Sequence, residues 1–506
     1  MFKNINIAFT LSNKKMTCTN QTKNIFQNTE DYYVHQFNTG CLAQFSYYIE
    51  SNKEAIIIDP IRESDIYIDL LKVRGAKLKY ILETHFHADF VSGHCELAKL
   101  TGAEIVFGPS AKPQYDSIVA NDGDLLNLGD VKIQVFHSPG HTLESSSFTL
   151  LDRTHTPKAI FTGDFLFLGE VGRPDLAVSN EISERDLAGM LFDSITKLKK
   201  TLPDDVVIFP GHGAGSACGK NISSGVSDTL GNQKKTNYAL NDNLKKEEFI
   251  EIVTSNLPTP PKYFFFDAMM NKKGYDTTET ILEKSYRAIN PKDFIELAKE
   301  KDIAVLDTRD FNKSMSGFFK ESYLISLKIT YAITTANMFP PNQKFLFITD
   351  PGQERESILR LARVGYENSV GFVEGGYEGL EKYCVSQGLV DKISFIRTVQ
   401  NDNLKTFVEE IIEKQNMEIV DVREKSEWES TGVVPNAKLV SLGNIEGRID
   451  EFIEIGENKP LVVYCRSGGR AAVAGSILKK YNIPQVYSIG GILNMITHNV
   501  PIKKLK

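Results

Sequence analysis

Histidine and aspartate side chains gather in four short turns in the first half of the chain. The turns are Thr84-His85-Phe86-His87-Ala88-Asp89, Ser138-Pro139-Gly140-His141-Thr142, Phe161-Thr162-Gly163-Asp164-Phe165 and Phe209-Pro210-Gly211-His212-Gly213. Each follows a short apolar run that is typical of a buried strand, and loops at strand ends commonly carry functional residues. Imidazole and carboxylate groups are metal ligands, so the four turns together predict a metal site.

The donors in these turns are nitrogen and oxygen atoms. We expect His85, His87, His141 and Asp164 to hold the metal, and this set includes no thiolate. Two histidines and a carboxylate with open coordination positions are the set used by non-haem Fe(II) oxygenases. Zinc hydrolases use a similar set, so these residues alone leave the ion open between ferrous iron and zinc.

Two cysteines stand in segments that favour a reactive thiol. Cys465 follows the apolar run Leu461–Tyr464 and precedes a helix-forming stretch, so free backbone N–H groups at the helix start would stabilise its thiolate. We predict Cys465 as a nucleophile, with its substrate bound by the rest of its loop: Arg466, Gly468, Gly469 and Arg470. Cys218 lies between glycines and beside Lys220, and we predict a lowered thiol pKa and a functional role there too.

The composition excludes several classes of function. The chain has 506 residues, with 58 Lys and Arg against 65 Asp and Glu, giving a net charge of −7 and no basic tract. Such a chain is poorly suited to nucleic acid or to an anionic membrane surface, and it has no apolar run long enough to span a membrane. Its six cysteines form no CxxC pair, so we expect free thiols and a cytoplasmic location.

The length predicts about three domains, and an internal repeat shows where two of them lie. Leu306–Asp310 matches Val420–Glu424, and Phe372–Gly376 matches Tyr487–Gly491 at nearly the same offset. Strand, turn and helix patterns alternate in both copies, which predicts small α/β domains with parallel sheets. We therefore expect an N-terminal extension (1–30), a metal domain (31–275) and two repeat domains (288–388 and 395–506). The first copy has Thr349 or Asp350 where the second has Cys465, so we expect it to be catalytically inactive.

The ordered set HxHxD, GHT, GD and GHG resembles the metallo-β-lactamase superfamily. That resemblance implies an αββα sandwich with the metal at one edge of its sheets. The family pattern continues with a histidine that helps to hold a second ion, and here that position is Phe90. A phenyl ring has no lone pair for a metal, so we expect one ion per chain and expect Asp89 and His212 to have lost their partner.

Within this superfamily the chain resembles the persulfide dioxygenases. The resemblance implies a mononuclear iron on His85, His141 and Asp164, with His87 either a fourth ligand or a group behind the ligands. The same branch has a Gly-Arg-x-Asp turn, so Arg173 either binds an anionic substrate or makes a salt bridge with Asp175. In members fused to sulfurtransferase domains, a cysteine placed like Cys218 implies persulfide handling near the iron.

Residues 395–506 resemble the rhodanese sulfurtransferases, in which the loop cysteine carries a sulfane sulfur as a persulfide. Four residues separate Cys465 from Arg470, a loop length that suits sulfur better than phosphate. The two resemblances together suggest that a thiol persulfide and O2 give sulfite at the iron, and that Cys465 converts sulfite to thiosulfate. A zinc thioester hydrolase of the hydroxyacylglutathione type and a sulfur carrier with a structural metal are the alternatives. The superfamily also implies a homodimer or homotetramer.

Overall fold

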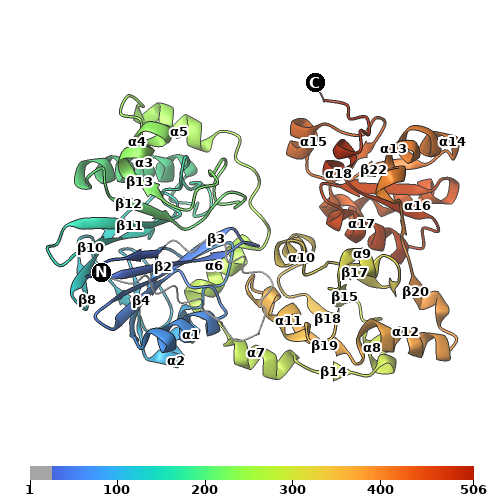
Figure 1. The fold of residues 1–506 in the computed structure, drawn as a ribbon, viewed down its shortest axis with the longest axis horizontal. Coiled ribbons are helices and arrows are strands. Elements are labelled where there is room, and N and C mark those ends of the chain that lie inside the picture. The colour runs from blue at the N-terminus through green and yellow to red at the C-terminus, as the bar shows by residue number, and fades with distance from the viewer. Residues whose placement is uncertain (1–25, 506) are drawn as a thin grey trace, which may run out of the picture.

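The computed structural model describes residues 26–505, and Figure 1 shows three bodies along the chain. A sandwich of two sheets comes first, a middle domain on one parallel sheet follows, and a C-terminal domain on another parallel sheet comes last. Cys18 lies outside the described residues. Within residues 26–505, no helix has the length and apolar character needed to cross a membrane.

The sandwich packs two sheets face to face. The first sheet has the spatial order β1 (Phe26–Asn28), β2 (Tyr33–Thr39), β3 (Gln44–Ser51), β4 (Glu54–Ile58), β5 (Lys77–Glu83), β6 (Glu104–Phe107) and β7 (Ile118–Val119). The second has the order β13 (Asp228–Thr229), β12 (Val207–Pro210), β11 (Pro157–Gly163), β10 (Ser146–Leu151), β9 (Val131–His137) and β8 (Leu125–Leu128). Apolar side chains such as Ile56, Leu82 and Phe148 fill the space between them.

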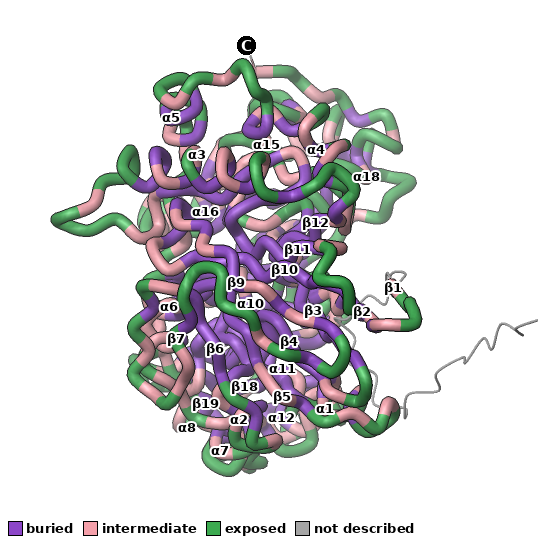
Figure 2. Tube along the Cα trace, turned by 90° about the vertical axis from the view of Figure 1, so that its left-hand side faces the viewer, coloured by how far each residue is buried: buried purple, intermediate pink, exposed green. Residues whose placement is uncertain are grey.

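Helices cover the outer faces of both sheets. Leu71 of α1 (Asp65–Arg74) and Leu97 of α2 (His94–Thr101) pack on the first sheet. The second sheet is covered by α3 (Glu184–Thr201), α4 (Leu230–Thr236) and α5 (Lys246–Thr254). Because both of its faces are covered, β3 is buried along its whole length, as Figure 2 shows for the central strands. This layering confirms the predicted αββα sandwich.

The two parallel sheets share one topology. The middle sheet has the order β14 (Ala288–Ile289), β19 (Ser369–Val373), β18 (Lys344–Ile348), β15 (Ile303–Asp307) and β17 (Ser322–Leu324). The C-terminal sheet has the order β21 (Arg397–Thr398), β25 (Val486–Gly491), β24 (Leu461–Cys465), β22 (Glu418–Asp421) and β23 (Lys438–Leu439). Strands at the same place in the two sheets also come in the same chain order, as a duplication requires.

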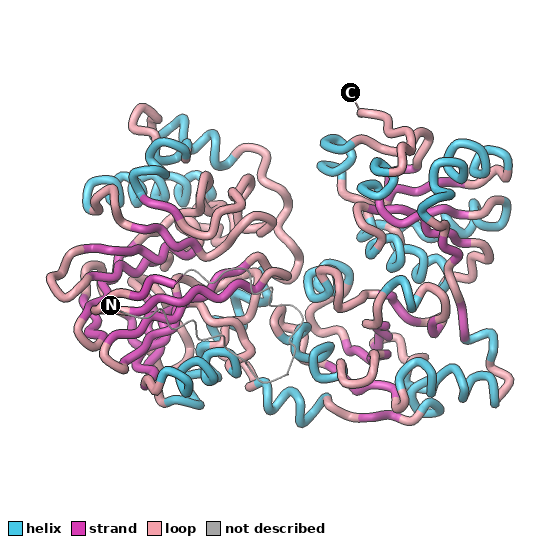
Figure 3. The backbone as a smooth tube through the Cα atoms, in the orientation of Figure 1, coloured by secondary structure: helices cyan, strands magenta, loops and turns pink. Residues whose placement is uncertain are grey.

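Helices flank each parallel sheet (Figure 3). In the middle domain they are α8 (Pro291–Leu297), α9 (Phe311–Ser314), α10 (Tyr331–Met338), α11 (Glu354–Ala362) and α12 (Gly376–Ser386). In the C-terminal domain they are α13 (Leu404–Thr406), α14 (Ile412–Lys414), α15 (Lys425–Thr431), α16 (Ile449–Asn458), α17 (Gly469–Lys480) and α18 (Ile492–Thr497). The linking helices α6 (Phe264–Lys273) and α7 (Thr278–Ser285) join the sandwich to the middle domain.

Two strands pair across the predicted domain boundaries. β1 pairs with β2, so the segment 1–30 contributes a strand to the sandwich. β20 (Ile393–Ser394) pairs with β16 (Phe318–Phe319), so pairing in the middle domain extends beyond residue 388. Turn patterns mark where a strand can end, but they do not show which sheet takes up an edge strand.

Two buried arginines join the sandwich to the middle domain. Arg62 of the sandwich donates to the carbonyl of Ala362 (2.6 Å) and pairs with Glu367. Arg363, directly after α11, pairs through Nε with Glu63 of the sandwich (2.5 Å). Its own carbonyl accepts the Val91 N–H (2.6 Å), close to the predicted metal turn. A polar and buried contact therefore ties the two domains together, two residues beyond the predicted metal turn.

Replacing Arg363 with Ala should lower the free energy of unfolding by about 3–5 kcal/mol, because the Glu63 carboxylate would stay buried without its cation. Chemical denaturation followed by circular dichroism measures the change. Arg355→Ala is the matched control, since Arg355 pairs with Asp65 across the same two domains but both side chains are about half exposed or more. The control should cost less than about 1 kcal/mol. Equal losses in the two variants would contradict a stabilising role for the buried pair.

Candidate metal centre and cysteine loop

Three of the predicted ligands meet at one edge of the sandwich. His85 follows β5, His141 lies between β9 and β10, and Asp164 follows β11. Their ligand atoms lie within 4.8 Å of one another, and all three side chains are buried. The Oδ2 atom of Asp164 is 3.9 Å from His85 Nε2 and 3.7 Å from His141 Nε2. We refer to these residues as the triad.

Hydrogen bonds orient both triad histidines with Nε2 toward Asp164. The Nδ1 of His141 donates to the carbonyl of Arg173 (2.8 Å). The hydroxyl of Thr84 donates to Asp59 Oδ2 (2.8 Å), which leaves its oxygen to accept from His85 Nδ1 (3.0 Å). Holding Nδ1 in this way presents the lone pair of Nε2 to an ion. Burial, with the charge on His87, lowers the pKa of His85 well below its ordinary value, so the ring is in the neutral form that ligates.

A metal ion fits the triad. The buried Oδ2 atom of Asp164 has no hydrogen-bond partner among the described residues, and a buried carboxylate oxygen requires a donor or a cation. Two glycines lie so close to the triad that a larger residue would not fit at either position. A Cβ on Gly172 would lie 3.0 Å from His141 Nδ1, and one on Gly211 would lie 2.6 Å from Asp164 Oδ1. The triad therefore has the donors, the orientation and the unsatisfied charge that a divalent cation would meet.

His87 lies apart from the triad. Its Nε2 is 3.1 Å from Asp59 Oδ1 and 3.7 Å from Glu83 Oε2, and the three residues form a separate buried group. Burial opposes a charge on His87, but the two carboxylates outweigh it and raise its pKa to about 9. Because Nε2 of His87 faces Asp59 and Glu83, this geometry favours a position behind the ligands over the fourth-ligand role.

Arg173 is occupied by its own loop. Nε and Nη2 bind the two oxygens of Asp175 (2.7 Å each), Nη1 donates to Ala217 O (3.2 Å), and Nη2 also donates to Pro258 O. The residue is buried, so the salt bridge expected as the alternative is what the structure shows. This arrangement favours the salt-bridge alternative: the Arg173 carbonyl holds His141, and its side chain fixes the loop before Cys218. The substrate-binding role stays a prediction.

Cys218 lies with Asp89 and His212 next to the triad. The ligand atoms of these three buried residues are within 4.8 Å of one another. Burial, followed by the charges of Asp89 and Asp164, raises the pKa of the Cys218 thiol well above its ordinary value. Lys220, expected beside the thiol, instead donates to the Ile252 carbonyl (2.8 Å). The expectation of a lowered thiol pKa is wrong because a neighbour in sequence points elsewhere.

The Cys465 loop has the predicted strand-to-helix geometry. Cys465 ends β24, α17 begins at Gly469, and the Gly468 N–H donates to Cys465 Sγ (3.1 Å). Gly468 has φ +107°, a left-handed conformation that favours glycine. The two arginines differ: Arg470 is held by both carboxylate oxygens of Glu427 (2.6 and 2.7 Å), and Arg466 is exposed. Glu427, which no sequence motif indicated, thus positions Arg470.

The middle domain covers this loop. A Cβ on Gly468 would lie 3.2 Å from Phe311, and one on Gly469 would lie 2.5 Å from Ile329, both of the middle domain. In the equivalent loop of the middle domain, Asp350 pairs with Lys313 (2.9 Å). This position has no thiol to act as a nucleophile, and the loss of activity in this copy stays a prediction.

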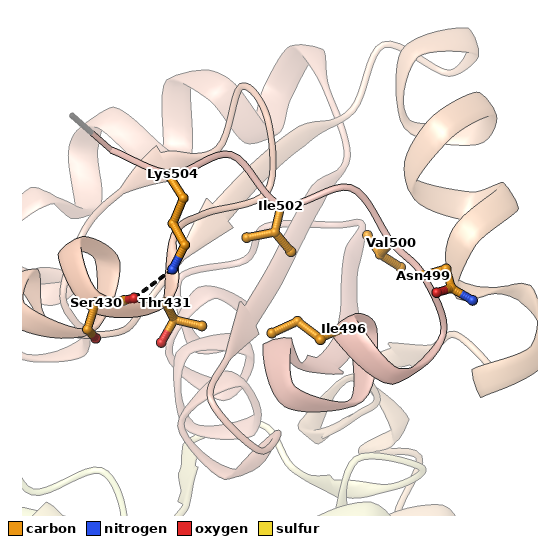
Figure 4. A pocket seen from close by; sticks show the side chains of 7 residues that line it. All are labelled: Ser430, Thr431, Ile496, Asn499, Val500, Ile502 and Lys504. Carbon is orange, nitrogen blue, oxygen red and sulfur yellow. Dashed lines mark hydrogen bonds between the residues drawn. The ribbon is translucent and has the colours of Figure 1, made fainter.

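A hollow of about 660 Å³ lies elsewhere in the C-terminal domain (Figure 4). Ser430, Thr431, Ile496, Asn499, Val500, Ile502 and Lys504 line it. Lys504 Nζ is bound to the Ser430 carbonyl (2.8 Å), so the only charged group of the lining is directed at the protein. The candidate chemistry therefore stays with the triad and with Cys465.

Comparison with known proteins identifies two of the domains. The metallo-β-lactamase superfamily matches residues 39–212, and the rhodanese-like domain family matches residues 405–495. The chain is 31% identical over 217 residues to the mitochondrial persulfide dioxygenase ETHE1 of Homo sapiens, covering 42% of this chain and 77% of that protein. It is 32% identical over 170 residues to a hydroxyacylglutathione hydrolase of Tolumonas auensis, covering 32% of this chain and 59% of that protein.

A solved structure is similar in fold to a larger part of this chain. A metallo-β-lactamase from Staphylococcus aureus matches with a TM-score of 0.58 and 29% identity, over 68% of this chain and 99% of that one. The match thus extends beyond the sandwich. The chain belongs to the metallo-β-lactamase superfamily, as a fusion of a domain homologous to persulfide dioxygenases with a C-terminal rhodanese-like domain.

Proposed function

We propose that the protein is a persulfide dioxygenase joined to a thiosulfate-forming sulfurtransferase. The observation that carries the proposal is the pairing, on one chain, of a buried His/His/Asp triad with a cysteine in a strand-to-helix loop. The homology to persulfide dioxygenases and the rhodanese-like match support sulfur chemistry in both domains. The substrates would be a low-molecular-weight thiol persulfide and O2.

His85, His141 and Asp164 would hold one ferrous ion, a donor set used by non-haem iron oxygenases. The ion would supply the redox chemistry with O2 that no side chain provides. One persulfide, one O2 and one water give one thiol, one sulfite and two protons. Thr84 and the Arg173 carbonyl keep the two histidines oriented, and the burial of the triad excludes bulk water.

Cys465 would then form thiosulfate. Its thiolate attacks the outer sulfur of a second persulfide, the substrate S–S bond breaks, and the proton leaves with the released thiol. Sulfite attacks the outer sulfur now held on Cys465, so that thiosulfate leaves and the thiolate is restored. The Gly468 N–H lies where it stabilises the negative charge on Sγ in both steps.

A zinc thioester hydrolase is the second candidate, because hydroxyacylglutathione hydrolases are also similar to the sandwich. Phe90 counts against it, because the usual superfamily pattern has at this position a histidine that helps to hold a second ion. Turnover of a glutathione thioester by the zinc-loaded enzyme would favour it. A protein inactive on every persulfide, but with reactive Cys465, would instead be a sulfur carrier. The cytoplasmic location and the homodimer or homotetramer stay predictions.

His141→Ala should lower both iron content and O2 uptake with glutathione persulfide by about 100-fold or more, because losing a ligand costs at least as much as losing a group that orients one. Iron analysis and an oxygen electrode measure the two effects. His498→Ala, a histidine outside the sandwich, is the control and should change neither. If the iron-loaded wild-type protein consumes no O2, the dioxygenase half of the proposal fails.

Thr84→Val should weaken iron binding by about 10- to 100-fold, because it removes the oxygen that holds His85 Nδ1 while keeping the side-chain shape. Competition with a chelator measures the affinity. Thr149→Val, at a buried threonine of β10, is the matched control and should leave the affinity unchanged. Unchanged affinity in Thr84→Val would show that this hydrogen bond does not orient the ligand.

Cys465→Ser should abolish thiosulfate formation and leave O2 uptake intact, with sulfite accumulating in its place. Chromatography of the sulfur anions separates the two products. Cys384→Ser, at a buried thiol of the middle domain, should behave as the wild type. Undiminished thiosulfate in Cys465→Ser would assign the transfer to another group.

A further inference from the structure

Asn271 of the linking helix α6 binds the backbone of the metal turn (84–89) and of the residues that follow it. Its Nδ2 donates to the carbonyls of His87 and Phe90 (2.8 Å each), and its Oδ1 accepts the N–H of Ser92 (2.9 Å). These partners lie 179 to 184 residues earlier in the chain. Only the folded structure therefore brings this side chain to the turn.

The carboxamide of Asn271 matches these three partners. It has two N–H donors and one carbonyl acceptor, which meet two carbonyl groups and one N–H group. Asn271 is 1% exposed, so bulk water is excluded from these bonds. A carboxylate here would present acceptors to both carbonyls, and an apolar side chain would leave buried backbone groups without partners. Asparagine is therefore specifically suited to this position.

Other groups beyond the sandwich hold the same segment. The Val91 N–H donates to the carbonyl of Arg363 in the middle domain (2.6 Å). The hydroxyl of Tyr275, which lies between α6 and α7, donates to the Ser92 carbonyl. The ring of Phe90 is buried in an apolar cluster that includes residues of α6 and of the middle domain. The backbone between the metal turn and α2 is thus positioned by parts of the chain that follow the sandwich.

This segment is continuous with a ligand of the triad. His85 lies two residues before His87, and the centroids of the two rings are 4.2 Å apart. The ring of His87 lies 4.3 Å from that of Phe90 on its other neighbour contact. A shift of the backbone at His87 or Phe90 therefore moves a ring that packs on His85. Metal affinity depends on such groups behind the ligands, because they fix the direction of the ligand atoms.

We propose that Asn271 is a positioning residue for the metal centre. Its carboxamide fixes the backbone at His87, Phe90 and Ser92, and so sets the orientation in which His85 reaches the ion. The inference rests on the proposed metal-binding role of the triad, but not on the reaction that the metal performs. Asn271 supplies no ligand atom and acts through the backbone of the turn, which gives the linking helix a part in the metal centre.

Asn271→Asp tests the proposal, because it keeps the shape of the side chain and replaces both donors with an acceptor. The full-length chain, stripped of metal, is loaded with one equivalent of Co2+, whose visible absorption bands depend on the geometry of its ligands. We expect these bands to differ from those of the wild type. The affinity for Fe2+, measured by competition with a chelator, should fall by about 10-fold or more. Asn271→Ser, too short to reach the turn and uncharged, should change both readouts in the same direction.

Tyr115→Phe is the matched control. It removes the hydroxyl that donates to the backbone carbonyl of Asn271 (2.6 Å) but leaves the carboxamide in place, so the cobalt bands and the iron affinity should stay unchanged. Circular dichroism shows that each variant is folded. Wild-type bands and affinity in both Asn271 variants overturn the proposal, as does an equal change in Tyr115→Phe. A wild-type protein that binds cobalt at the triad but consumes no O2 contradicts the proposed function alone.

Discussion

The carboxylate of Asp164 is the group on which the metal region depends. It is buried, and its two oxygens serve two different sets of residues: Oδ2 faces His85 and His141, and Oδ1 accepts from His212. A buried carboxylate is costly unless it is paired or bound to a cation. The fold meets this cost by converging three histidines on Asp164 from turns that are far apart in the sequence, and this convergence is what makes the edge of the sandwich suited to a metal.

The middle domain has no loop cysteine, but it contacts the Cys465 loop and the segment that follows the metal turn. Through Arg363 it pairs with Glu63 and holds the backbone of Val91 beside the metal turn. Through Phe311 and Ile329 it packs against the glycines of the Cys465 loop. The middle domain thus packs against both other domains near their candidate sites, although its own loop has no cysteine.

The structure brings some of the predicted site residues together and places others apart. Turn motifs that follow apolar runs predicted a metal site, and the resemblance to the persulfide dioxygenases selected His85, His141 and Asp164 as its ligands. The sequence left two alternatives open for His87 and for Arg173, because Asp59, Asp175 and Pro258 compete for their side chains. These competitors come from other turns and loops, and local patterns do not show which way a side chain turns.

The sequence by itself determined the αββα sandwich, the duplicated parallel sheets, the triad and the cysteine at a strand-to-helix junction. The parallel sheets and the cysteine junction follow from hydrophobic periodicity and glycine-marked turns, which are local properties of the chain. The sandwich and the triad follow from the resemblance of the turn motifs to the metallo-β-lactamase superfamily. Only the tertiary structure decided that Cys218 lies with Asp89 and His212, that Glu427 holds Arg470, and that the middle domain covers the Cys465 loop. Such contacts join residues from separate loops, and their geometry depends on how whole layers pack.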